Sequence, residues 1–131
     1  MGKRSTSRRL AMQAVYQAEV SGIGIDEALK NLLEEEKYIP ETVEFAQKLA
    51  RAAWDKIKEN DKIIEKLSVD WPLDRIGKVD HSILRLALYE IDAGETPASV
   101  VIDEAVELAK KYSSREAAKF INGILGSYLR K

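Results

Sequence analysis

Apolar residues recur along this chain at intervals of three and four positions, which is the spacing of one face of an α-helix. The first such stretch predicts a helix from about Thr6 to Val20 that ends at Gly22. Its apolar face is made by Leu10, Ala11, Ala14, Val15 and Ala18. Strand signals are almost absent, because the β-branched run at residues 100–102 leads directly into a helical pattern. The pattern therefore predicts an all-α fold.

Three more helical segments are expected before residue 70. Asp26 is typical of an N-cap and predicts the start of a second helix. Pro40 suits the first turn of a long third helix, whose apolar face continues to about Asn60, a length of about 30 Å. Asn60 or Asp61 then restarts a short helix that reaches Leu67. The connecting loops are short, which favours antiparallel neighbours in a compact bundle.

A break is predicted at residues 70–73, where the residue before a proline avoids the helical conformation. A short turn over Leu73–Ile76 follows and ends at Gly77. We take this break as the boundary between two subdomains, residues 1–70 and 71–131. The sequence therefore predicts one all-α, compact helical domain of 131 residues, made of two small three-helix-type bundles.

The second half begins with the most apolar helix of the chain, predicted from about Val79 to Asp92 and ended by Gly94. Apolar residues occupy nearly all faces of this helix, so it is expected to be the central buried one. Thr96 as the cap and Pro97 at the first helical position start the next helix, which runs to about Tyr112.

The last helix opens with Ser113 and Glu116, which have the spacing of a capping box. Its apolar face predicts packing on the core through Ala117, Ile121, Ile124, Leu125 and Tyr128.

Composition restricts the class of protein further. The chain has no cysteine, which excludes disulfides and thiolate zinc sites and favours a cytoplasmic location. No run approaches the roughly 18 apolar residues that a membrane span requires, so no membrane association is expected. The charged N-terminus is not followed by an apolar segment and is therefore no secretory signal.

Charge is unevenly distributed, although the formal net charge is only −1. The first 18 residues hold four cations and no acid, which leaves 17 of the 21 basic residues against 22 acidic ones in the remainder. The four cations are Lys3, Arg4, Arg8 and Arg9. This asymmetry is typical of a basic arm that contacts phosphates beside a soluble body, although a solvated terminus without a role is an equally good reading.

Candidate catalytic chemistry is missing. His81 is the one histidine and lies at the start of an apolar helix, where a lone histidine is more often a surface or capping group. Asp103, Glu104 and Glu107 cluster on one helix, but a di-metal bundle needs Glu-x-x-His pairs from two helices. We expect an acidic helix start, with no metal site, no cofactor and no enzymatic activity.

The last helix carries the strongest binding candidates. Lys119, Phe120 and Asn122 supply a cation, a stacking face and an amide able to contact a base edge. By its spacing, Phe120 is as well explained as a core residue. Gly123 is unusual inside a helix, where it costs roughly 1 kcal/mol against alanine, and it allows another helix or a ligand to approach closely.

A protein interface is the third candidate. Apolar and charged residues alternate beside the predicted boundary, which suits a partner surface. They are Trp71, Leu73 and Ile76 with Asp74, Arg75, Lys78 and Asp80. Trp71 and Ile76 are equally well explained if they close the core between the subdomains.

Several blocks of this sequence resemble the NusB family. The blocks are residues 83–90 (ILRLALYE), 102–112 (IDEAVELAKKY) and 119–125 (KFINGIL), with 8–17 (RRLAMQAVYQ) and 71–80 (WPLDRIGKVD) in support. The resemblance extends over essentially the whole chain in order, and its C-terminal block is the specific part.

The resemblance implies a NusB-like fold of two small helical bundles and a role in transcription antitermination, without enzymatic activity. Its implied partners are the ribosomal protein NusE, single-stranded boxA RNA of ribosomal RNA leader transcripts, and the RNA polymerase antitermination complex. NusB-like domains also occur fused to ribosomal RNA methyltransferases, but this chain has no cofactor-binding fold. The implied RNA-binding residues are Lys3, Arg4, Arg8, Arg9, Lys119, Phe120 and Asn122. The residues expected at the partner interface are Arg75, Lys78, Asp80 and Glu116.

One alternative belongs to another class of protein. A helical scaffold that binds only protein, as a homodimer for example, would have the same composition and periodicity. Co-elution of the purified protein with RNA or with itself distinguishes the two hypotheses.

Overall fold

Regular structure in the computed structural model, which describes residues 2–68 and 71–130, is entirely helical. Within those ranges there are seven α-helices and one short 3-10 helix. They are α1 (Lys3–Ser21), α2 (Ile25–Leu33), α3 (Pro40–Asp55), α4 (Ile57–Leu67), η1 (Leu73–Arg75), α5 (Lys78–Ala93), α6 (Ala98–Tyr112) and α7 (Arg115–Leu129). The all-α prediction is confirmed. Within the described ranges, no helix combines the length and apolarity needed to cross a membrane.

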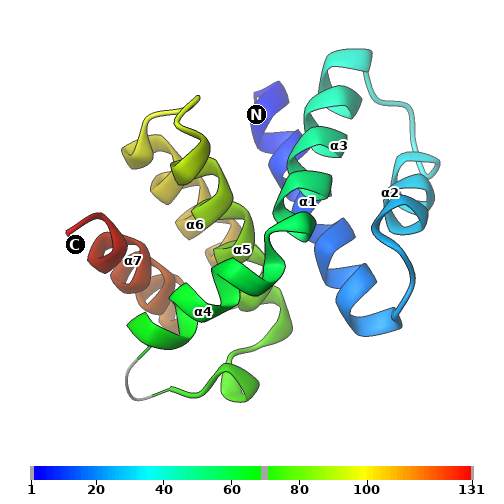
Figure 1. Cartoon of the computed structure of the whole chain (residues 1–131). Coiled ribbons are helices and arrows are strands. Elements are labelled where there is room, and N and C mark those ends of the chain that lie inside the picture. Colours follow the sequence, from blue (N-terminus) through cyan, green and yellow to red (C-terminus); the bar gives the residue numbers. More distant parts are fainter. Residues whose placement is uncertain (1, 69–70, 131) are drawn as a thin grey trace.

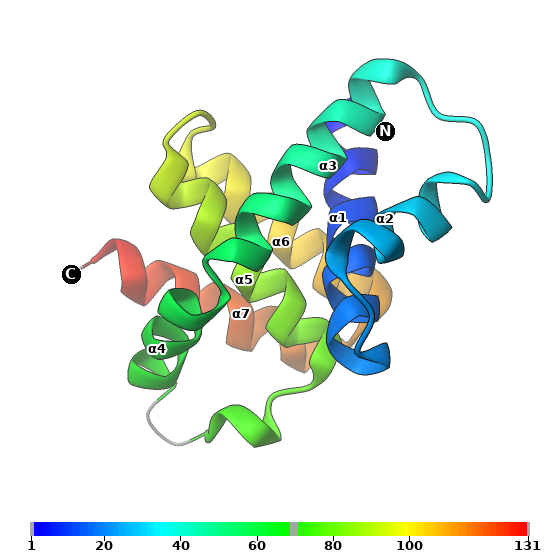
Figure 2. The same ribbon diagram turned by 45° about the vertical axis from the view of Figure 1, so that its right-hand side comes forward.

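Helix α5 lies at the centre of the molecule, as its apolar sequence predicts. It contacts α1, α3, α4, α6 and α7. Its residues Ile83, Leu84 and Leu88 are at most 1% exposed. Figures 1 and 2 show α1, α2 and α3 gathered on one side of α5, with α4 and α7 on the other. The predicted subdomain boundary at residues 70 and 71 stays a prediction, although α4 packs against α5 and α7.

Small side chains set the contact between α1 and α3, which lie side by side. Both helices bury alanines that are at most 1% exposed, among them Ala11, Ala14, Ala46, Ala50 and Ala53. A methyl side chain leaves the helix backbones free to approach closely. This contact fixes the start of α1 against the start of α3, where the candidate site is built.

Two helix ends differ from the prediction. Helix α1 begins at Lys3 instead of Thr6, so most of the basic arm is helical. The long third helix ends at Asp55, because the backbone at Lys56 leaves the helical region (φ −99°, ψ 14°) before α4 begins. Asn60, expected near the end of that helix, lies buried inside α4.

The glycine stops are confirmed. Gly22 ends α1 and Gly94 ends α5, both with φ 72°. Glycine enters this left-handed region without the steric cost that a Cβ imposes.

Two predicted N-caps are wrong. Gly24 is the N-cap of α2, and Asp26 lies in the first turn, where its carboxylate accepts a hydrogen bond from Arg51 Nε at 2.7 Å. Pro97 occupies the N-cap position of α6, which has no side-chain cap, so Thr96 does not cap it. Asp26 still lies where the helix dipole favours an anion.

The cap of α7 lies one residue later than predicted. Ser114, and not Ser113, is the N-cap, and its Oγ accepts a hydrogen bond from the backbone N–H of Ala117 at 3.0 Å. The capping-box prediction for Ser113 and Glu116 is therefore wrong, and Glu116 is exposed in the first turn.

The predicted break between the halves is confirmed in its described part. Asp70 lies outside the described residues, and η1 follows at Leu73–Arg75. Ile76 is 4% exposed and belongs to the core, whereas Trp71 is 48% exposed. Trp71 therefore does not close the core between the two halves.

Candidate nucleic-acid interface

The basic N-terminal segment forms the first turn of α1. Cations at a helix N-terminus oppose the helix dipole, so they need other partners. Lys3 Nζ pairs with Glu41 Oε1 of α3 at 3.2 Å. The guanidinium carbon of Arg4 lies 3.8 Å from the centroid of the Phe45 ring, a cation–π contact. Helix α3 thus positions both side chains that begin α1.

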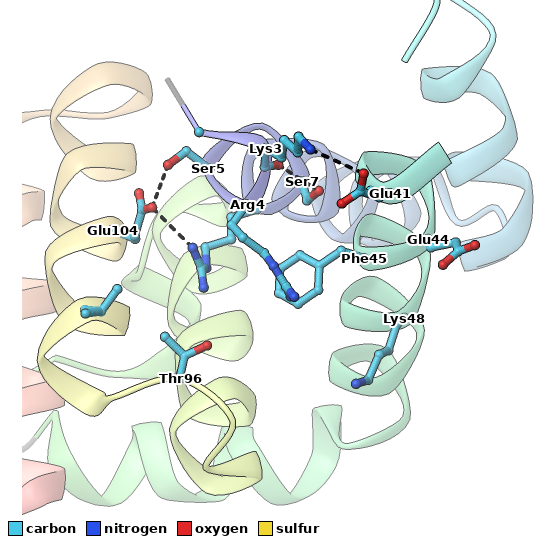
Figure 3. Close-up of a pocket in the computed structure, with 13 residues that line it drawn as sticks. Lys3, Arg4, Ser5, Ser7, Glu41, Glu44, Phe45, Lys48, Thr96 and Glu104 are labelled. Atoms are coloured by element: carbon cyan, nitrogen blue, oxygen red, sulfur yellow. Dashed lines mark hydrogen bonds and ion pairs between the residues drawn. The ribbon is translucent and has the colours of Figure 1, made fainter. Parts of the chain in front are cut away.

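A groove of about 770 Å³ opens beside this contact, between the first turn of α1, helix α3 and the start of α6. Figure 3 shows Arg4 lying across Phe45, with Lys48 and Thr96 farther along the walls. The groove carries mixed charge, because Lys3 pairs with Glu41, and Lys48 pairs with Glu95 at 3.0 Å. Arg4 is the exposed cation of this groove that forms no ion pair with a described residue.

Arg8 is buried, although it follows the same basic segment. Its Nε donates to Glu90 Oε1 at 2.7 Å and its Nη2 to Glu90 Oε2 at 2.8 Å. Its Nη1 donates to Glu104 Oε1 at 3.2 Å, and this oxygen also accepts a hydrogen bond from Ser5. Burial disfavours the Arg8 charge, but the hydrogen bonds and attraction of Glu90 and Glu104 outweigh it and raise the Arg8 pKa. The Arg8 guanidinium therefore joins α1, α5 and α6 and does not face solvent.

Arg9 occupies a different groove. Its Nη1 donates to Gln13 Oε1 at 3.1 Å. The groove, about 420 Å³, lies between α1 and the end of α6 and is also lined by Lys110, Lys111 and Tyr112. Arg9 is half-buried, so part of its side chain contacts solvent.

The three RNA-binding candidates on α7 differ in their exposure to solvent. Lys119 and Asn122 are exposed, whereas Phe120 is half-buried and packs against the core. Gly123 is exposed, and a Cβ built on it would meet no atom within 4 Å. No second helix therefore approaches Gly123 closely.

The structure places the two sets of RNA-binding candidates in separate grooves. Lys3, Arg4 and Arg8 line the groove of Figure 3, and Lys119 and Phe120 line another beside Trp71. The two grooves share no lining residue.

The four partner-interface candidates are spread over three elements. Arg75 lies in η1 and Lys78 begins α5, and both are exposed. Asp80 lies in the first turn of α5, where its buried Oδ1 accepts no hydrogen bond from the described residues. Glu116 is exposed at the start of α7. The helix dipole favours an acidic residue in the first turn, so the positions of Asp80 and Glu116 are explained without a partner protein.

A second buried ion network was not predicted from the sequence. Arg85 is 4% exposed, and its Nε and Nη2 donate to Asp61 at 2.9 and 2.8 Å, while its Nη1 donates to Glu19 at 2.8 Å. His81 Nε2 lies 2.7 Å from Asp61 Oδ1. His81 is therefore a buried member of this network and not the surface or capping group that was expected.

The network also sets the ionisation of Asp61. Burial alone would raise the Asp61 pKa, but the hydrogen bonds from Arg85 and His81 outweigh it and lower that pKa to about 2. Glu19 of α1, Asp61 of α4 and the two residues of α5 hold three helices together. A charged residue on a helix that is buried all round must be paired, and this rule could have identified Arg85 and Glu90.

Comparison with known proteins decides the family. The family model described as NusB family matches residues 5–130 of this chain. The chain belongs to the NusB family. Transcription antitermination protein NusB of Bacillus subtilis (strain 168) is 42% identical over 126 residues, covering 95% of this chain and 93% of the relative. The corresponding protein of Symbiobacterium thermophilum is 40% identical and covers 97% and 89%.

Solved structures share the fold. A crystal structure of the antitermination factors NusB and NusE in complex with double-stranded RNA contains a chain that superposes with a TM-score of 0.91 at 32% identity, covering 99% of this chain and 98% of that one. T. maritima NusB superposes with a TM-score of 0.89 at 31% identity, covering 100% and 92%. The predicted NusB-like fold is confirmed. The chain is a NusB-family transcription antitermination factor and not an enzyme.

Proposed function

We propose that this chain pairs with the ribosomal protein NusE and that the pair binds single-stranded boxA RNA in ribosomal RNA leader transcripts. The observation that carries this proposal is the likeness, over nearly the full length of both chains, to a NusB that was crystallised with NusE and RNA. The site of action is the cytoplasm, within the RNA polymerase antitermination complex.

In this proposal, different residues contact the phosphates and the bases of the RNA. Exposed Lys3 and Arg4 contact phosphates, and Arg9 contributes from the neighbouring groove. Lys119, Phe120 and Asn122 face an unpaired base. Arg8 acts as a positioning residue, because its ion pairs with Glu90 and Glu104 are buried.

The partner interface is assigned to Arg75, Lys78, Asp80 and Glu116. The exposed charges of Arg75, Lys78 and Glu116 would steer association with a ribosomal protein surface of complementary charge, while Asp80 is half-buried. Charge reversal at Arg75 and Lys78 should therefore slow NusE binding and leave the fold intact.

Size-exclusion chromatography with light scattering tests the assembly. The proposal predicts a 1:1 complex with purified NusE, which then shifts further on addition of a boxA RNA. The matched control is a scrambled RNA of the same length. A chain that elutes at twice its own mass and takes up neither NusE nor RNA would support the homodimeric scaffold instead.

A further inference from the structure

Helix α3 holds the first two cations of α1 in different ways. The Nζ of Lys3 lies 3.2 Å from Glu41 Oε1, whereas the Arg4 guanidinium lies over the Phe45 ring. Glu41 and Phe45 are four positions apart and share one face of α3, and Figure 3 shows both beside the first turn of α1. A glutamate compensates the charge with which it pairs, and an aromatic ring does not. Arg4 therefore keeps an uncompensated charge, and Lys3 does not.

We propose that Glu41 competes with RNA phosphate for Lys3 and thereby lowers the affinity of the chain for RNA of any sequence. Glu41 is an intramolecular competitor, which an RNA must displace before Lys3 can bind a phosphate. This inference rests on the proposed function and deepens it, because it adds a residue that restrains RNA binding to the residues that provide it.

The Lys3–Glu41 pair is not needed to fold this part of the molecule. The two side chains are 60% and 75% exposed, and exposed ion pairs contribute little to stability. Buried contacts fix α1 on α3 instead. Ser7 Oγ donates to the carbonyl oxygen of Thr42 at 2.8 Å, and both residues are at most 4% exposed. The pair can therefore open without any movement of the two helices.

The position of Glu41 favours its charge and sets it against a phosphate. Glu41 lies in the first turn of α3, where the helix dipole favours an anion. A phosphate oxygen that binds Lys3 Nζ must displace the Glu41 carboxylate or lie within a few ångströms of it. Displacement breaks the ion pair, and close approach adds repulsion between like charges. Both courses weaken the contact between Lys3 and the RNA.

The competition acts equally on all RNA sequences. Contacts to phosphates position an RNA and carry no sequence information. Non-specific binding consists almost entirely of such contacts, so Glu41 favours the release of RNA that offers only phosphates. An RNA that also contacts NusE, and whose bases are bound, stays in the complex despite the same loss.

Glu41→Gln tests the inference, because it removes the competing charge and keeps the size of the side chain. The complex of this variant with NusE should bind a labelled boxA RNA about 2- to 5-fold more tightly than the parent complex, the range for one exposed ion pair. A scrambled RNA of the same length should gain by the same factor. The urea midpoint of unfolding should stay unchanged. A salt concentration of about 0.15 M limits the effect of charges farther away than about 8 Å.

Glu44→Gln is the matched control, because it removes the same charge from the same helix. Glu44 is exposed and forms no ion pair with a described residue, and Figure 3 shows its side chain directed away from Lys3. Its substitution should change the RNA affinity less than Glu41→Gln does. In the Lys3→Ala background, Glu41→Gln should have no larger effect than Glu44→Gln, because the group for which Glu41 competes is gone. Met1 lies outside the described residues, and its charge is the same in every variant, so it cancels from the comparison.

Three results would overturn the inference and leave the proposed function standing. They are an unchanged RNA affinity of Glu41→Gln, an equal gain in affinity by Glu44→Gln, and a gain by Glu41→Gln that persists in the Lys3→Ala background. A parent complex that binds no single-stranded RNA would remove both the inference and the proposed function.

Discussion

Arg8 offers the sharpest test of the division between structural and RNA-binding residues. The perturbation is Arg8→Met, which keeps much of the side-chain volume and removes the charge. In the structure, the side chains of Arg8 and Glu90 are only 7% and 8% exposed and share two hydrogen bonds of 2.7 and 2.8 Å. The substitution leaves the Glu90 carboxylate buried without its partner.

The expected loss follows from that unpaired charge. Breaking a buried ion pair by removal of one partner typically costs about 3–5 kcal/mol. Glu104 adds little to the cost, because it is 25% exposed and keeps its hydrogen bond from Ser5. Since domains of this kind have about 5–15 kcal/mol of stability in total, Arg8→Met should remain folded but clearly destabilised.

Urea unfolding monitored by far-UV circular dichroism measures this loss. The double variant Arg8→Met with Glu90→Met is the control, because replacing both partners by apolar residues is often neutral or stabilising by about 1–4 kcal/mol. The double variant should therefore recover most of the stability that Arg8→Met loses. Its affinity for RNA in the complex with NusE should equal that of the parent chain.

Two results would contradict a purely structural role of Arg8. If Arg8→Met unfolds within about 1 kcal/mol of the parent, the pair contributes no more than an exposed salt bridge does. If the refolded double variant also loses RNA affinity, Arg8 reaches the RNA itself.

Three further predictions concern acid stability, phosphate contacts and stacking. The folded-state pKa of Asp61 is lowered from 3.8 to about 2. The ionised carboxylate therefore adds roughly 2 kcal/mol to the free energy of unfolding above pH 4, and this stabilisation is lost as the pH falls through 2. Urea unfolding between pH 5 and 2 should show this loss of stability, and the unfolding free energy of Asp61→Asn should depend less on pH. Equal pH dependence in the parent and the variant would show that the Asp61 carboxylate is not responsible. Replacing Lys3 and Arg4 by alanine should reduce the slope of log affinity against log salt concentration by about 1.4, and an unchanged slope would exclude phosphate contacts. Phe120→Ala should weaken RNA binding while costing less stability than the roughly 3–5 kcal/mol of a fully buried phenylalanine, and a larger loss would make Phe120 a core residue.

The sequence predicted the helices better than their ends. Gly22 and Gly94 stop their helices because a left-handed residue satisfies the last carbonyls, and the sequence displays that signal directly. The break at Lys56 has no such signal, because neither proline nor glycine is present there. Tertiary packing decides it, since α4 turns to contact α5 and α7.

Charged residues were the harder part of the site to predict. A basic run at the N-terminus predicts exposed cations, and Lys3 and Arg4 are exposed, although helix α3 holds both side chains. Arg8 belongs to the same run but lies one helical turn later, on the face that meets α5 and α6. Only the packing of three helices places Glu90 and Glu104 around it, and local spacing carries no information on that arrangement.

Fluorescence anisotropy of a short labelled boxA RNA, titrated with this chain over a series of salt concentrations, with and without NusE, tests the proposed RNA binding directly. Specific binding should tighten when NusE is added and weaken as the salt concentration rises. Equal binding to a scrambled RNA in both cases, or no binding at all, would contradict the proposal.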